Sequence, residues 1–227
     1  MIKFINITKS YPPNIFALRN VSFHIKPGEF VSIVGQSGAG KTTILRLIIA
    51  EEKPTKGKVI IGGWDIRDAK QNEIPLLRRQ IGVIFQDFKL LSKKTVYENI
   101  EFSLQVIGTP FKKIPGIVSQ ALKIVGLENK ARNFPPQLSA GEAQRAAIAR
   151  AMVYRPKILL ADEPTGNLDP INTREVIELL LRINELGITT VLVTHNREIV
   201  NLIKKRVITL DQGMIIGDQQ EKGRYVI

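Results

Sequence analysis

A run of glycines followed by a lysine and two threonines carries the clearest chemical meaning in the sequence. The run reads Gly35-Gln36-Ser37-Gly38-Ala39-Gly40-Lys41-Thr42-Thr43, which fits the P-loop pattern of Gly, four residues and Gly-Lys-Ser/Thr. Because glycines lack Cβ atoms, the backbone N–H groups of such a loop can turn inward onto phosphate oxygens. We therefore expect a nucleotide phosphate site, with Lys41 on the β- and γ-phosphates and the Thr42 hydroxyl on Mg²⁺.

The residues on either side supply the setting that a P-loop requires. Residues 30–34 form an apolar run typical of a buried strand, and a helical pattern follows with apolar residues at Ile44, Leu45, Leu47 and Ile48. The N-terminal end of that helix would also favour an anion. A chance match in a glycine-rich turn is the alternative, and the strand–loop–helix order argues against it.

Two carboxylates follow a second apolar strand. Residues 157–161 predict a buried strand that runs directly into Asp162 and Glu163. Charged side chains rarely end such a strand without a partner. Asp162 fits the role of holding Mg²⁺, and Glu163 is positioned to polarise an attacking water. The alternative is that both are caps or surface charges at the strand end.

Polar side chains follow three predicted strands, at residues 81–85, 157–161 and 188–194. Gln86 follows the first, the two carboxylates follow the second, and His195 follows the third. In an open parallel sheet the carboxyl ends of the strands line the ligand crevice. A lone histidine at a strand end is more often structural, but this convergence favours a functional role for His195.

Two further helix starts carry recognisable caps. Ser139 and Glu142 fit a capping box, which predicts a helix from there to about residue 154. A helix N-terminus with an exposed serine and Gly141 is also a place where an anion can bind. Asp169 and Pro170 predict the N-cap and first residue of another helix.

The N-terminal part predicts strands that are buried on one side. Residues 2–8 and 21–25 alternate in polarity, with Val21, Phe23 and Ile25 on one face, and Tyr11 is expected in the link between them. Tyr11 either fills the core or stacks on a nucleotide base, and the residue alone favours the core. 

The middle of the chain has a helical rather than a strand-like sequence pattern. After residue 87 the strand-like runs disappear, and amphipathic helical patterns follow near 96–107 and 115–125. We expect one α/β domain over residues 1–227, with a helical sub-lobe at about 87–154 inserted in it.

The composition excludes several classes of protein. No apolar run approaches the ~18 residues of a membrane span, the start of the chain alternates like a strand rather than a signal peptide, and the absence of cysteine rules out disulfides. The formal charge of +12 suggests nucleic acid or an anionic membrane as a partner. The basic residues occur only as pairs and triplets, so a solvated surface is favoured, with some weight on a membrane-adjacent face, and no nucleic acid is expected.

Taken together, these motifs resemble the ATP-binding subunits of ABC transporters over the whole length of the chain. The resemblance implies a P-loop NTPase fold with a mixed, mainly parallel sheet core, an N-terminal antiparallel β region and the inserted helical sub-lobe. It makes Gln86 the Q-loop residue, Asp162 the Walker B residue, Glu163 and His195 the catalytic pair, and Asp169 part of the D-loop. It also makes Tyr11 the aromatic that stacks on the base, which reverses the preference for the core.

The resemblance further implies the ligands and a dimer. ATP is the substrate, and Mg²⁺ would be held by Thr42, Gln86 and Asp162. The signature motif is represented by Ser139, Ala140, Gly141 and Glu142, where Ala140 and Glu142 replace the usual glycine and glutamine. It lies at the far end of the inserted lobe, so it is expected to serve the ATP of a second copy in a head-to-tail homodimer.

Within this family the chain is similar to bacterial cell-division ATP-binding proteins in residues 51–57 and 77–91. Residues 164–169 are similar to these proteins and also to the related ATPases of lipoprotein release and macrolide export. The similarity to cell-division proteins implies an integral membrane partner, a location on the cytoplasmic face of the cell membrane, and control of cell-wall hydrolases. The alternatives are an ATPase of lipoprotein release or macrolide export, and an ABC-type ATPase acting on nucleic acid or ribosomes. A binding module without turnover is a further alternative, which the presence of both Glu163 and His195 opposes.

A docking region for the membrane partner is expected directly after Gln86. Phe88, Leu90 and Leu91 are followed by Lys93 and Lys94, which is the pattern of an apolar anchor site rimmed by charge. The alternative is that these apolar residues fill the core of the helical sub-lobe.

Overall fold

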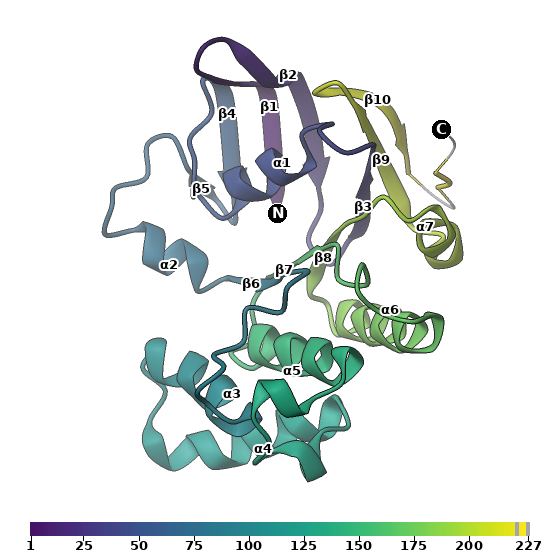
Figure 1. Ribbon diagram of the computed structural model, residues 1–227. Helices are drawn as coiled ribbons and strands as arrows, with labels where there is room; N and C mark the ends of the chain where they lie inside the picture. Colours follow the sequence, from purple (N-terminus) through teal and green to yellow (C-terminus); the bar gives the residue numbers. More distant parts are fainter. Residues whose placement is uncertain (221–222, 226–227) are drawn as a thin grey trace.

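Two β-sheets and a lobe of helices make up the computed structural model, which describes residues 1–220 and 223–225 (Figure 1). One sheet has the order β2-β1-β4-β5, and the other has the order β10-β9-β3-β8-β7-β6. The four-stranded sheet contains β1 (Ile2–Tyr11), β2 (Ile15–Ile25), β4 (Lys56–Ile61) and β5 (Trp64–Asp65). The six-stranded sheet contains β3 (Phe30–Val34), β6 (Ile81–Ile84), β7 (Ile158–Asp162), β8 (Thr189–Val193), β9 (Arg206–Asp211) and β10 (Met214–Gln219).

The four-stranded sheet is antiparallel, as predicted for the N-terminal region. Val21, Phe23 and Ile25 are buried in alternation along β2, which confirms the predicted inward face. The first strand is longer than expected, because pairing with β2 continues to Tyr11 opposite Ile15. Tyr11 is therefore the last residue of β1 rather than part of the link.

The six-stranded sheet is mixed. Strands β6, β7, β8, β3 and β9 run parallel, and β10 pairs antiparallel with β9 in a hairpin. Every residue of β3 and β8 is buried, as is usual for strands covered on both faces. Because β6, β7 and β8 are parallel, the residues that follow them meet at one edge.

Seven α-helices and three short 3₁₀ turns occur in the described part of the chain. The helices are α1 (Lys41–Ile48), α2 (Ile74–Arg78), α3 (Val96–Val106), α4 (Ile114–Ile124), α5 (Ala140–Met152), α6 (Pro170–Glu185) and α7 (Arg197–Ile203). The 3₁₀ turns are η1 (Phe111–Lys113), η2 (Glu128–Lys130) and η3 (Pro135–Gln137). None of the helices in residues 1–220 and 223–225 has the length and apolar character needed to cross a bilayer.

The predicted caps are present. The Ser139 hydroxyl accepts a hydrogen bond from Glu142 N–H at 3.2 Å, and the Glu142 carboxylate accepts one from Ser139 N–H at 2.8 Å. Asp169 accepts hydrogen bonds from the N–H groups of Ile171 and Asn172 at the start of α6. These local bonds fix where α5 and α6 begin.

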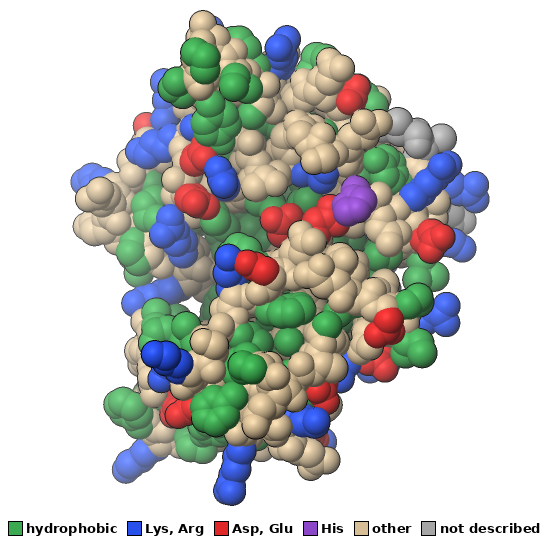
Figure 2. All heavy atoms as spheres, viewed as in Figure 1, with side chains coloured by type: hydrophobic (Ala, Val, Ile, Leu, Met, Phe, Trp, Pro, Cys, Tyr) green, Lys and Arg blue, Asp and Glu red, His purple; other side chains and the backbone are tan. Residues whose placement is uncertain are grey.

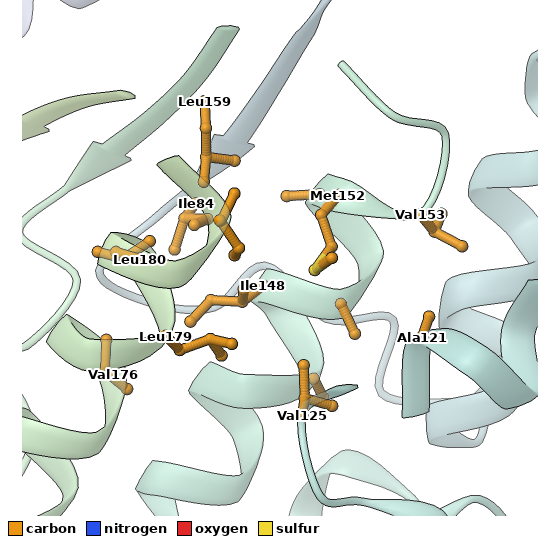
Figure 3. Packing of buried hydrophobic residues seen from close by; sticks show 14 of the residues in the cluster. Ile84, Ala121, Val125, Ile148, Met152, Val153, Leu159, Val176, Leu179 and Leu180 are labelled. Carbon is orange, nitrogen blue, oxygen red and sulfur yellow. The ribbon is translucent and has the colours of Figure 1, made fainter. Parts of the chain in front are cut away.

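Side chains on the two faces of the six-stranded sheet enter different cores. Along β7, Ile158 and Leu160 pack toward α1 and the four-stranded sheet, whereas Leu159 and Ala161 pack toward the helices. The second core runs without a break into α3, α4, α5 and α6. In Figure 3, Ile148 of α5 lies beside Leu179 of α6, below Ile84 and Leu159 of the sheet. The helical lobe is thus joined to the sheet by a shared core, with α5 as the connecting helix.

Candidate nucleotide-binding and catalytic site

A cavity of about 670 Å³ lies where the P-loop faces the carboxyl ends of β6, β7 and β8. Its volume is in the usual range for small-molecule sites. It brings together most of the predicted nucleotide, metal and catalytic residues. The lining residues are Ala17, Gln36, Ser37, Gly38, Gly40, Lys41, Thr42, Thr43, Gln86, Asp162, Glu163, His195 and Tyr225. Figure 2 shows acidic side chains and a histidine gathered near the middle of one face, which agrees with this arrangement.

The P-loop needs glycine where its backbone passes close to neighbouring strands. Gly40 has a φ of 102°, and a Cβ there would lie 2.5 Å from the carbonyl oxygen of Ala17 in β2. A Cβ at Gly35 would collide with the carbonyl of Leu210 in β9. Gly35 therefore packs against β9, and neither Gly35 nor the buried Ala39 lines the cavity.

Lys41 spans the inside of the P-loop. Its Nζ donates to the carbonyl oxygens of Gly35 at 2.7 Å and of Gln36 at 2.9 Å. Burial lowers the pKa of the Lys41 ammonium, while the nearby carboxylates of Glu163 and Asp162 oppose that shift. Phosphate oxygens can replace these two carbonyls as acceptors, so the ammonium is already in place to bind a triphosphate.

The start of α1 adds a second element of anion binding. Gly40 is the N-cap of α1 and offers no side-chain acceptor to the first N–H groups of the helix. These groups, together with the positive end of the helix dipole, are open to an anion in the cavity. The predicted combination of loop, lysine and helix start is therefore realised in the fold.

Glu163 and His195 form a fixed pair. Glu163 Oε1 lies 2.7 Å from His195 Nδ1 and accepts a hydrogen bond from the His195 N–H at 3.1 Å. Its Oε2 accepts one from the Thr194 hydroxyl at 3.1 Å. Glu163 also has a φ of 45°, an uncommon conformation for a non-glycine residue that recurs at functional sites. The contacts orient a carboxylate that can accept a proton from water.

Asp162 has the environment of a cation ligand. Burial raises its pKa, the neighbouring Glu163 carboxylate raises it further, and Lys41 opposes the shift. Thr42 and Gln86 line the same cavity and supply further oxygen donors. Mg²⁺ prefers oxygen ligands and commonly binds through one or two carboxylates plus substrate phosphates and waters. The donor set of Thr42, Gln86 and Asp162 therefore fits Mg²⁺.

The turn after Gln86 is held by α5, the helix that begins at the predicted signature motif. Phe88 and Lys89 have φ values of 58° and 49°, which is unusual for two consecutive side-chain-bearing residues. Arg150 of α5 donates to the carbonyl oxygen of Phe88 at 2.8 Å and also to that of Lys89. The position of Gln86 is thereby connected to α5.

The predicted signature residues lie outside this cavity. Ser139 and Ala140 are exposed at the start of α5, and Glu142 is occupied by the capping box. Gly141 is buried, and a Cβ there would collide with the side chain of Asn172 in α6. The chain does not bring its own signature residues to its own P-loop.

Asp169 is also absent from the cavity lining, but its neighbours Leu168 and Pro170 line a second cavity next to Glu163 and His195, the predicted catalytic pair. A second cavity of about 520 Å³ is lined by Leu168 and Pro170 and shares Gln86, Glu163 and His195 with the first. The predicted D-loop segment therefore borders the predicted catalytic pair, and Asp169 itself lines neither cavity.

Tyr11 is not part of the cavity lining either. Its hydroxyl donates to the Glu52 carboxylate at 2.7 Å, and the Lys9 ammonium lies 5.0 Å from the ring centroid. Stacking of Tyr11 on a nucleotide base stays a prediction.

Two lining residues were missed from the sequence. Ala17 and Tyr225 both contact the cavity but belong to no motif. Ala17 gives no signal in the sequence. Tyr225 could have been noticed as an aromatic residue in an otherwise polar C-terminal stretch.

Comparison with known proteins gives consistent similarities. Residues 18–166 match the family described as ABC transporter. The cell division ATP-binding protein FtsE of Bacillus subtilis (strain 168) is 51% identical over 225 residues, which cover 99% of this chain and 98% of that protein. FtsE of Escherichia coli (strain K12) is 46% identical over 217 residues, which cover 96% of this chain and 98% of that protein.

A solved structure shares the fold. The ATP-binding cassette MJ0796, in a dimeric post-hydrolysis state bound to ADP and Pi, has a TM-score of 0.87 and 38% sequence identity. The match covers 98% of this chain and all of that one.

Proposed function

The chain belongs to the ABC transporter family and is an ATPase, and we propose that it is the ATP-hydrolysing subunit of a membrane complex acting in bacterial cell division. The observation that carries the proposal is the near-full-length similarity to FtsE proteins, at 51% identity for the Bacillus subtilis relative. The chemistry is supported by the cavity that places Glu163 and His195 opposite the P-loop.

Different residues of the cavity have different roles in ATP hydrolysis. The P-loop N–H groups and Lys41 bind the triphosphate and stabilise the charge that develops on it. Thr42, Gln86 and Asp162 would hold Mg²⁺, which neutralises phosphate charge when bound. Glu163 accepts the proton of the attacking water, and its bonds to Thr194 and His195 keep the carboxylate oriented for that transfer.

Two copies of the chain are proposed to pack head to tail when ATP is bound. Ser139 and the start of α5 lie away from the P-loop of the same chain, so they are free to bind the γ-phosphate held by a second copy. The related cassette MJ0796 was solved as a dimer bound to ADP and Pi, which supports this arrangement. Loss of the γ-phosphate would then remove the bridge between the copies.

The membrane partner is proposed to be an FtsX-like integral membrane subunit. The chain would sit on the cytoplasmic face of the cell membrane through this partner, with its basic surface facing anionic lipid, and would transmit ATP-driven changes to cell-wall hydrolases. The test is a pull-down of the tagged chain from detergent-solubilised membranes. Recovery of an FtsX-like subunit supports the proposal, whereas recovery of an exporter permease or of ribosomes in its place contradicts it.

The predicted docking region presents one side chain to solvent. Leu91 is 40% exposed, and its backbone is fixed because its N–H donates to Asn99 Oδ1 at 2.7 Å and its carbonyl accepts from Asn99 Nδ2 at 3.1 Å. Leu90 is partly buried and packs against the core of the helical lobe, and Phe88 is half-buried. Leu91 is therefore the best candidate anchor of the three.

We expect that polar substitution of at least one of Phe88, Leu90 and Leu91, and foremost Leu91→Ser, blocks recruitment to membranes that contain the partner. Because Leu91 is exposed, the substitution should change the free energy of unfolding by no more than about 0.5 kcal/mol. The measurement is the fraction of membrane-bound protein on co-expression with the membrane subunit, together with the melting temperature and ATP affinity.

Ile124→Ser is the matched control for this prediction, since Ile124 is 46% exposed on α4 of the same lobe. It should leave recruitment unchanged. If each variant of the docking region either stays membrane-bound or loses stability together with recruitment, the partner docks elsewhere.

A further inference from the structure

Residues 223–225, which follow β10 in the sequence, lie next to the nucleotide cavity. Arg224 N–H donates to Gln219 Oε1 at 2.8 Å, and Gln219 Nε2 donates to the Arg224 carbonyl at 3.1 Å. Gly223 N–H donates to the carbonyl of Lys205, just before β9, at 3.1 Å. These bonds fix the backbone that leads into Tyr225, and Figure 1 shows this segment beside α7.

Gly223 allows an approach that a larger residue would prevent. A Cβ at this position would lie 2.7 Å from the Val207 side chain and 2.9 Å from the Lys205 carbonyl oxygen. Both distances are shorter than an ordinary van der Waals contact. The close packing of this segment on β9 therefore depends on glycine.

Tyr225 connects two parts of the nucleotide site. Its N–H donates to Asn201 Oδ1 in α7 at 3.1 Å, and the residue is only 8% exposed. It packs in one cluster with Val34, Val200 and Val207. Val34 immediately precedes the P-loop, and Val200 lies in α7, which begins two residues after His195. Tyr225 also lines the cavity beside the P-loop.

We propose that Tyr225 is a positioning residue of the nucleotide site, whose ring holds the junction of β3 and the P-loop against α7 and thereby sets the affinity for ATP. The P-loop binds phosphate through the direction of its N–H groups, so a shift of its supporting strand weakens binding. The inference rests on the assignment of this cavity to ATP, and it does not depend on the membrane partner. The competing explanation is that the ring only fills the core at the end of the chain.

The test compares Tyr225→Ala with Tyr225→Phe by titration with a fluorescent ATP analogue and by steady-state kinetics. Tyr225→Ala is expected to weaken nucleotide binding and to raise KM by about fivefold to tenfold, with kcat changed less than about threefold, because the substitution leaves the Glu163 carboxylate and its hydrogen bonds to Thr194 and His195 in place. Tyr225→Phe keeps the ring and should bind within about twofold of the unmodified chain. Weak binding by Tyr225→Phe would overturn the role given to the ring.

Two further variants separate positioning from stability. Gly223→Ala displaces the segment that carries Tyr225 without replacing any residue that lines the cavity, and it should weaken binding in the same way as Tyr225→Ala. Ile203→Ala removes a buried α7 side chain that packs in the core shared with the helical lobe, not in the cluster around Tyr225. It should lower the melting temperature while leaving ATP affinity unchanged. Unchanged affinity in Tyr225→Ala, or an equal loss in Ile203→Ala, overturns the inference.

Lys41→Ala in the same titration shows which claim has failed. If Lys41→Ala binds the analogue like the unmodified chain, the assignment of the cavity to ATP is wrong. If Lys41→Ala loses binding and Tyr225→Ala does not, only the role of Tyr225 is wrong.

Discussion

Glu163→Gln is expected to bind ATP normally and to hydrolyse it about 10²–10⁴-fold more slowly, which corresponds to roughly 3–5 kcal/mol of barrier. Glutamine has nearly the shape of glutamate, and its amide oxygen can still accept hydrogen bonds from Thr194 or His195, which hold Glu163. The amide cannot take a proton from water at neutral pH. Binding and geometry are therefore kept while the base is lost.

Phosphate release at saturating ATP and Mg²⁺ measures the loss, and gel filtration with ATP should show the variant accumulating as a dimer. Glu185→Gln makes the same chemical change at the exposed end of α6 and should retain full turnover. Turnover by Glu163→Gln at the rate of the unmodified chain would mean that the base lies elsewhere.

Lys41→Ala is expected to abolish productive ATP binding. Lys41 already donates two hydrogen bonds within the P-loop, at 2.7 and 2.9 Å, and the same donors would reach the phosphates. Hydrogen bonds to charged groups contribute about 1.5–3 kcal/mol each, so losing two of them should weaken binding by roughly 10²–10⁴-fold. Burial of the ammonium strengthens the effect, because water screens its attraction to phosphate less.

Titration calorimetry with ATP measures this change directly. Lys123→Ala is the matched control, because Lys123 is exposed on α4 and far from the P-loop in the chain. It should bind ATP with unchanged affinity. Equal affinities for Lys41→Ala and the unmodified chain would rule out the role given to Lys41.

Structural features that depend on a short stretch of sequence could be predicted well. The P-loop lies between β3 and α1 as its pattern requires, and the capping box of Ser139 and Glu142 starts α5 as expected. The meeting of Gln86, Glu163 and His195 followed from one further rule, that parallel strands end at the same edge of a sheet. Each of these depends on spacing that can be read along the chain.

Features set by distant contacts could not be predicted. The turn at Phe88 and Lys89 is held by Arg150, about sixty residues further along the chain. No local sequence pattern predicts this contact. Tyr225 reaches the cavity only because the hairpin and the close approach at Gly223 bring the chain back to β9. The hydrogen bond from Tyr11 to Glu52 likewise depends on the path of the chain after α1.

The claim that two copies of the chain build each catalytic site is tested most directly by mixing two inactive variants. Lys41→Ala removes the phosphate cation of the P-loop. Ser139→Asp keeps a good N-cap for α5 but places a negative charge where the γ-phosphate of the second copy would lie. In a mixed dimer, one site contains both defects and the other contains none.

Phosphate release should therefore be nearly absent for each variant alone and recover to roughly a quarter of the unmodified rate in an equal mixture, because half of the dimers then carry one intact site. A mixture that stays as inactive as its components, or a Ser139→Asp chain that hydrolyses ATP at the full rate on its own, would contradict a catalytic site shared between two copies.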